Sequence, residues 1–163
     1  MDRDQEKVYV DVLVESLEQK LKAMQQLMTY TKDQQEVLAK TEPDMEEFER
    51  LFDLKAIYLQ RMEEFDAGFQ RIYQQVSAEV SKNRYLYQDK ILRMQSCIKE
   101  ITELGVRIQA VEADNKNKFE QYVAREKKGI KSFKVSNKTA ASYYKNMANV
   151  PQAGESYFLN SKQ

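Results

Sequence analysis

The chain has 163 residues, with 26 basic and 26 acidic side chains, so its formal net charge is zero. Only 4 Gly and 2 Pro occur over this length, which excludes folds that need frequent turns, such as sandwiches, barrels and doubly wound sheets. With 42% apolar residues, including 10 Tyr and 7 Phe, the chain is too apolar to be wholly disordered. Composition therefore predicts one domain of long helices.

An apolar repeat with steps of three and four residues begins near the N-terminus and predicts a first helix over about residues 4–40. Its apolar stripe consists of Val10, Leu13, Leu17, Leu21, Met24, Met28, Thr31, Gln35 and Leu38. No basic region followed by an apolar stretch is found at the N-terminus, and no apolar run is long enough to span a membrane. We therefore expect neither a secretory signal nor membrane insertion.

The segment "AKTEPDMEE" interrupts this repeat. Thr41 can cap a second helix together with Asp44 three residues later, and Pro43 fits only a first turn. We predict the second helix over residues 43–82, antiparallel to the first because the connection is short. Its stripe consists of Phe48, Leu51, Lys55, Tyr58, Met62, Phe65, Phe69, Ile72, Val76 and Val80.

The end of the second helix has no Pro or Gly to mark it, so a continuous helix of about 80 residues remains an alternative. We place the turn near residues 82–88 and the third helix over 88–126. Gly105 within it should cost about 1 kcal/mol relative to Ala. The third stripe consists of Tyr87, Ile91, Met94, Ile98, Ile101, Gly105, Ile108, Val111, Asn115, Phe119 and Tyr122.

The predicted fold is all-α: an elongated antiparallel three-helix bundle or coiled coil, with a long helical hairpin and an extended C-terminal tail. We divide it into a bundle over residues 1–128 and a basic aromatic tail over 129–163. Residues 1–126 carry a net charge of −6, and the remainder carries +6. The tail can therefore seek an acidic surface.

Within the tail, a short helix is a candidate over residues 137–148, with an extended stretch after it. The alternative is a terminus without fixed structure. The aromatic residues Tyr157 and Phe158 at its end lie in the sequence "SYFLNSKQ". In a segment too short to bury them, such side chains suggest a contact with another surface.

Three polar residues interrupt the apolar stripes: Thr31, Lys55 and Asn115. If the turns centre near residues 42 and 85, the three lie at one level and form a polar layer across the bundle. We interpret the layer as a means of fixing register, with the Lys55 amine extending to solvent or to Asp114. A buried functional lysine is the alternative, but no catalytic residues accompany it.

Catalysis has little support in the sequence. The chain has no His, which is the commonest general base and metal ligand, and its single Cys97 cannot build a thiolate zinc site. The isolated Gly residues form no phosphate-binding loop. We expect no enzyme, no cofactor and no metal site, and the lone cysteine agrees with a reducing cytoplasm.

The stretch from Leu13 to Val76 resembles the FlgN family of flagellar type III export chaperones, whose general plan FliT-type chaperones share. Thr29 to Gln35 is similar to the family's "leLtkkQ"-like segment at the end of its first helix. The family's pattern in the next helix is matched here by Lys55, Ile57, Tyr58, Leu59, Met62, Phe65, Asp66 and Phe69. The tail resembles an aromatic "sYFFDkK"-like ending of some members, with Leu159 and Asn160 as departures.

The resemblance implies a cytoplasmic chaperone that binds the C-terminal amphipathic helices of hook-filament junction proteins. It would prevent their premature assembly and aid their delivery to the type III export gate. A client helix would lie in a groove, against apolar side chains that three helices leave partly uncovered. The expected partner-contact residues are Ile101, Ile108, Val111, Phe119, Tyr122, Tyr143, Tyr144, Met147, Tyr157 and Phe158.

Two other classes of function remain open. One is a homo-oligomeric coiled-coil adaptor without a client, and a homodimer is compatible with either reading. The other is a basic-tail binder of anionic surfaces, although seven spaced lysines without arginine make a weak signal for nucleic acid. The aromatic apolar stripes favour protein helices as partners.

Overall fold

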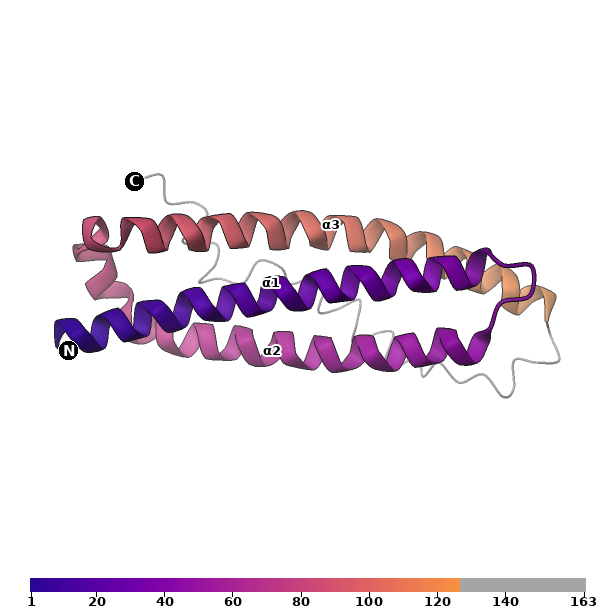
Figure 1. Ribbon diagram of the computed structural model, residues 1–163, viewed down its shortest axis with the longest axis horizontal. Helices are drawn as coiled ribbons and strands as arrows, with labels where there is room; N and C mark the ends of the chain where they lie inside the picture. The colour runs from indigo at the N-terminus through magenta and orange to yellow at the C-terminus, as the bar shows by residue number, and fades with distance from the viewer. Residues whose placement is uncertain (127–163) are drawn as a thin grey trace. The chain divides into compact units, whose positions relative to one another are not determined.

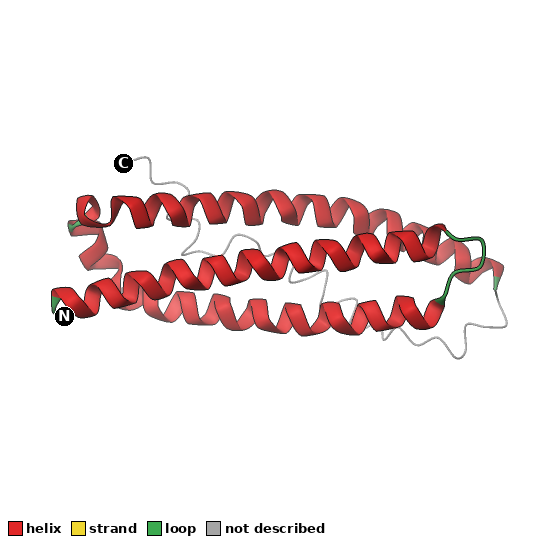
Figure 2. Cartoon of the chain, viewed as in Figure 1, coloured by secondary structure: helices red, strands yellow, loops and turns green. Residues whose placement is uncertain are grey.

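The computed structural model describes residues 1–126, and these are almost entirely helical (Figures 1 and 2). The elements in order are α1 (Arg3–Ala39), α2 (Met45–Lys82), the short 3-10 helix η1 (Arg84–Tyr87) and α3 (Gln88–Arg125). No strand occurs in this part of the chain. The prediction of an all-α chain with three long helices is confirmed, and the tail with its candidate helix at 137–148 lies outside the described residues.

The start of α2 differs from the prediction. Asp44, not Thr41, caps this helix, because its carboxylate oxygen Oδ1 accepts a hydrogen bond from the backbone N–H of Glu47 at 3.2 Å. The helix begins at Met45, so Pro43 lies before the cap and not in the first turn. A capping carboxylate also interacts favourably with the positive end of the helix. α1 has the same device, since Asp2 Oδ1 accepts from the N–H of Gln5 at 2.8 Å.

The chain turns between α2 and α3 through Asn83 and η1, which rules out one continuous helix. The N–H of Leu86 donates to the carbonyl of Asn83 at 2.9 Å and closes the turn. Tyr87, the last residue of η1, is buried. The turn is therefore made by a polar residue followed by a buried aromatic residue, without any Pro or Gly.

The described residues fall into two compact units. Unit 1 comprises Met1–Ala23 and Gln60–Glu103, and unit 2 comprises Met24–Leu59 together with residues 104–126. Each of the three long helices contributes one segment to each unit.

The core of unit 1 is apolar for the most part. Polar contacts also lie within it: the buried Lys20 pairs with the partly buried Asp66, with Nζ 2.8 Å from Oδ1, and the phenol of Tyr87 donates to Glu6 Oε1 at 2.8 Å. The buried apolar side chains of unit 1 are Val10, Leu13, Val14, Leu17, Leu21, Ala23, Met62, Phe69, Val76, Val80, Tyr87, Ile91, Met94, Cys97, Ile98 and Ile101.

The core of unit 2 contains a larger share of polar side chains. Its buried apolar residues are Met24, Leu27, Met28, Val37, Leu38, Phe48, Leu51, Leu59, Leu104 and Ile108. Its buried polar residues are Thr31, Gln34, Lys55, Glu112 and Asn115. Because these five side chains come from all three helices, they form the most distinctive feature of this unit.

Candidate partner-binding site

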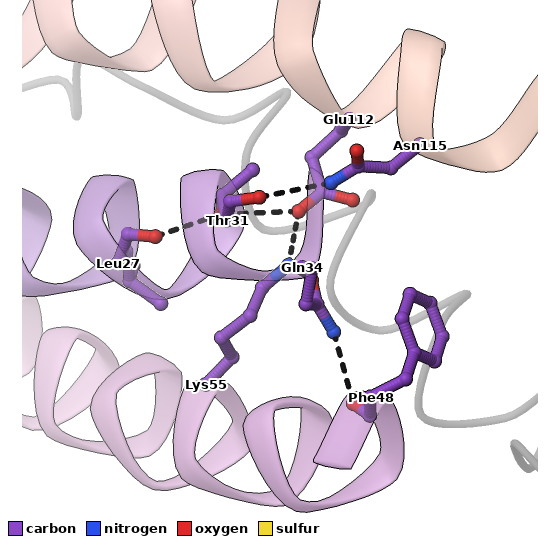
Figure 3. A network of polar contacts seen from close by, with 7 residues as sticks. All are labelled: Leu27, Thr31, Gln34, Phe48, Lys55, Glu112 and Asn115. Atoms are coloured by element: carbon purple, nitrogen blue, oxygen red, sulfur yellow. Dashed lines mark hydrogen bonds and ion pairs between the residues drawn. The ribbon is translucent and has the colours of Figure 1, made fainter. Parts of the chain in front are cut away.

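A network of buried polar side chains joins the three helix segments of unit 2 (Figure 3). Thr31 and Gln34 come from α1, Lys55 from α2, and Glu112 and Asn115 from α3. Residues three apart on a helix share one face, so the pairs 31/34 and 112/115 each point in one direction. That spacing brings both pairs to the lysine.

Lys55 is the centre of the network. Its side chain has almost no exposed surface, and its ammonium Nζ forms an ion pair with the Glu112 carboxylate. Nζ also donates to Gln34 Oε1 at 2.7 Å. The Gln34 amide donates in turn to the backbone carbonyl of Phe48 at 3.3 Å, which ties the first turns of α2 to α1.

Thr31 and Asn115 complete the network. The Thr31 hydroxyl donates to the Leu27 carbonyl at 2.7 Å and lies 3.2 Å from Glu112 Oε1. Asn115 Nδ2 donates to the Thr31 carbonyl at 3.0 Å, whereas its buried Oδ1 has no hydrogen-bond partner in the described part of the chain. The network is therefore dense around Glu112 and incomplete at Asn115.

The main electrostatic feature of the network is the Lys55 ammonium, a charged group that is buried away from water. Burial lowers the pKa of the Lys55 ammonium, and the neighbouring Glu112 carboxylate partly offsets this effect. The ammonium also lies 5.2 Å from the centre of the Phe52 ring, a favourable contact for a cation. Because all three helices contribute a partner at one level, the network sets their mutual register within unit 2.

The structure brings together the three polar residues that the sequence placed at one level: Thr31, Lys55 and Asn115. The expectation for the lysine amine was wrong, since it reaches neither solvent nor Asp114. Asp114 instead accepts from Gln35 at 3.1 Å and pairs with a lysine one helical turn further along α3.

The apolar pattern did not reveal Glu112 and Gln34, which contact the lysine. The signal was present, because each lies three residues from a predicted layer member on the same helix. A search for polar or charged residues one turn away from the polar stripe positions would have found both.

An apolar cluster lies beside the network, at the end of unit 2 that includes the connection between α1 and α2. Its buried members are Val37, Leu38, Phe48 and Leu51. Four partly buried side chains pack against these members: Tyr30, Met45, Phe52 and Phe119. The Phe119 ring of α3 stacks on Phe48, with 5.5 Å between ring centres and 2° between planes.

The predicted partner-contact residues divide into three groups. Ile101 and Ile108 have no exposed surface, so the expectation that they lie on an uncovered face was wrong: the facing helices cover them. Val111, Phe119 and Tyr122 are half-buried and keep some surface. The five tail residues Tyr143, Tyr144, Met147, Tyr157 and Phe158 lie outside the described residues.

Other classes of site find no support in the structure of residues 1–126. No group of three or more acidic, Cys or His side chains there could hold a metal ion. None of the helices in this range combines the length and apolarity that a membrane crossing requires.

Comparison with known proteins identifies the family. The family model described as FlgN protein matches residues 1–151. Neither the curated proteins nor the solved structures gave a match to the chain. Since the family model matches most of the chain, and since the described part is built of three long helices as the resemblance implies, the protein belongs to the FlgN family of flagellar export chaperones.

Proposed function

We propose that this chaperone acts in the cytoplasm on hook-filament junction proteins. It binds their C-terminal amphipathic helices, keeps these from assembling prematurely and aids their delivery to the type III export gate. The observation that carries the proposal is the match of the FlgN family model to residues 1–151. Helix-in-groove binding suits a chain of amphipathic helices with half-buried aromatic side chains.

Within unit 2, we propose that the partner-contact surface includes Val111, Phe119 and Tyr122 of α3. Phe119 lies over the apolar cluster and is only partly buried, so an amphipathic helix can cover the surface it leaves. Aromatic side chains are common anchors of protein interfaces because they bury a large area at little cost in conformational entropy. Ile108 then supports the site from within the core of unit 2.

We further propose the division into a helical body over residues 1–128 and a tail over 129–163. The tail, with its charge of +6 against −6 for residues 1–126, docks on the acidic body through Tyr157 and Phe158. It either occupies the client groove until a client displaces it or closes over the bound client. Tyr143, Tyr144 and Met147 are the tail's other proposed contact residues.

The test is isothermal titration of peptides that carry the C-terminal helices of the host's hook-filament junction proteins. The full chain should bind such a peptide, and the double variant Phe119→Ala with Tyr122→Ala should bind it about tenfold or more weakly. The matched control is Leu92→Ala with Val106→Ala, which removes two exposed apolar side chains of the same helix. Absence of binding by the full chain would refute the proposed function, and equal effects of both double variants would refute the proposed surface.

The same titration tests the tail. A shortened chain that ends at residue 128 should bind the peptide more tightly if the tail occupies the groove, and more weakly if the tail closes over the client. Unchanged affinity would refute the proposed role of the tail.

A further inference from the structure

The second half of α3 packs on the α1 and α2 segments of unit 2 with polar side chains in its most buried positions. Ile108 is the last apolar side chain of α3 that is buried among residues 1–126, and the buried side chains beyond it are Glu112 and Asn115. We call residues 109–125 the α3 arm. Over this length, the fully buried side chains are polar, and the apolar contact with the core comes from the partly buried Phe119.

Several polar contacts of the α3 arm lead to α1 and α2. Glu112 pairs with Lys55 and lies 3.2 Å from the Thr31 hydroxyl, while Asn115 donates to the Thr31 carbonyl at 3.0 Å. The half-buried Asp114 accepts from Gln35 at 3.1 Å. The apolar contact of Phe119 with Phe48 adds to these, but the Phe119 ring is only partly buried.

The α1 and α2 segments of unit 2 are joined more firmly to each other. The four buried members of the apolar cluster all belong to these two helices, and a short connection links them. The rings of Tyr30 and Tyr58 lie 5.7 Å apart. If one of the three helix segments of unit 2 separates from the other two, these contacts indicate that the α3 arm is the segment that separates.

The polar contacts of the arm lower the cost of its separation. A buried ion pair has given up its hydration, and opening restores water to both the ammonium and the carboxylate. The buried Oδ1 of Asn115, which has no partner in the described part of the chain, also gains water. An apolar arm of the same length would lose its burial on opening and regain nothing in return.

We propose that the Lys55–Glu112 pair is a releasable latch, and that the place of the opened α3 arm accepts an amphipathic helix of a client. This inference rests on the proposed chaperone function. The incoming helix must bring a carboxylate within its apolar stripe to Lys55, because a buried ammonium without a partner is strongly destabilising. Its apolar side chains cover the cluster around Phe48 that Phe119 leaves, while Phe119 and Tyr122 of the opened arm contact the other side of the bound helix.

Hydrogen exchange of the full chain tests the latch without any client. Under conditions in which exchange reports the opening equilibrium, amides of the α3 arm should exchange about tenfold or more faster than those of residues 88–103 in the same helix. Equal exchange in the two halves of α3 would overturn the proposal.

A double variant separates release of the latch from simple fraying of a helix end. Replacement of the pair by apolar residues, Lys55→Met with Glu112→Leu, should slow exchange in the α3 arm by about tenfold. The matched control, Lys20→Met with Asp66→Leu, removes the ion pair of unit 1 between a buried lysine and a partly buried carboxylate and should leave the arm unchanged. If the arm exchanges as fast in the first double variant as in the wild type, the latch is refuted.

A single variant serves if the apolar double variant does not fold. Glu112→Gln keeps the shape of the side chain but removes the anionic partner of Lys55, so exchange in the α3 arm should accelerate by about tenfold. No acceleration would count against the latch.

Titration with the C-terminal client peptides then tests the occupant. Lys55→Met with Glu112→Leu should bind them about tenfold more weakly, since the arm is held closed and the lysine is missing. The unit 1 control should bind like the wild type. If the arm opens as expected but no peptide binds, the proposed function fails while the latch stands; if peptides bind equally to all variants, the latch has no part in binding.

Discussion

Glu6 and Tyr87 show what a single pair of residues can contribute in this protein. Both side chains are buried, and the Tyr87 phenol donates a hydrogen bond to the Glu6 carboxylate at 2.8 Å. Burial of the phenol, together with the hydrogen bond and the negative charge of Glu6, raises the pKa of Tyr87 to about 12. Unit 1 therefore holds this tyrosine in its neutral form.

We expect Tyr87 to make the free energy of unfolding depend on pH in the alkaline range. Its pKa in the folded state is raised above the ordinary value of 10.0, so the stability it contributes is complete below that value and is lost as the pH rises through about 12. Chemical denaturation of the wild type and of Tyr87→Phe at pH values of about 9 and 11.5 measures the effect. At the lower pH, the free energy of unfolding of the wild type should exceed that of Tyr87→Phe by about 1–3 kcal/mol, because Glu6 loses its hydrogen-bond donor in the variant. This difference between the two proteins should shrink at the higher pH.

The matched control for this experiment is Tyr85→Phe. Tyr85 lies in the same 3-10 helix but is 74% exposed, so removal of its hydroxyl should change the free energy of unfolding little. A difference between wild type and Tyr87→Phe that is the same at both pH values would contradict the assigned cause.

The long helices as elements differ from their sequence patterns in one respect. Each predicted stripe is a single row, whereas a helix that packs against two others must bury a second row. In α1 the second row consists of Lys20, Ala23, Leu27, Gln34 and Val37. Two of these are polar, which explains why a search for apolar periodicity overlooked the row.

Gly68 in the interior of α2 is a weak point of that helix. A Cβ added there would meet no atom within 4 Å, and Gly is about 1 kcal/mol less favourable than Ala inside a helix. We therefore expect Gly68→Ala to increase the free energy of unfolding by about 0.5–1 kcal/mol, as measured by denaturant unfolding. Ala67→Gly, one position earlier at an exposed site, should lower it by a similar amount. A destabilising Gly68→Ala would mean that the site is more crowded than the structure shows.

On the scale of the whole molecule, the charges are unevenly divided along the chain. Residues 1–126 carry −6 and residues 127–163 carry +6, although the total is zero. Such a division favours association of oppositely charged parts, within one chain or between copies. The oligomeric state of the chaperone is therefore an informative measurement.

Sedimentation analysis distinguishes the chaperone from a homo-oligomeric adaptor. We expect the protein to form a one-to-one complex with a client C-terminal peptide. An adaptor would instead form an oligomer that is stable on dilution and does not change when the peptide is added. That second outcome would favour the adaptor. If the charged tail mediates the association of copies, a higher salt concentration should weaken the oligomer.

The sequence by itself determined the three long helices and their order. Helix formation and apolar periodicity are local properties, so steps of three and four residues reveal them without any knowledge of neighbours. The same steps placed Thr31, Lys55 and Asn115 on the inner faces of their helices. The local signals were weakest at the ends, where Asp44 replaced Thr41 as the cap of α2.

Only the tertiary structure decided which groups meet. Glu112 and Asp114 are two residues apart, so on a helix they point in nearly opposite directions and only one of them can reach the core. The rotation of α3 about its axis selects Glu112 as the partner of Lys55, and it also buries Ile101 and Ile108. That rotation results from packing against two other helices, which no stretch of a single helix records.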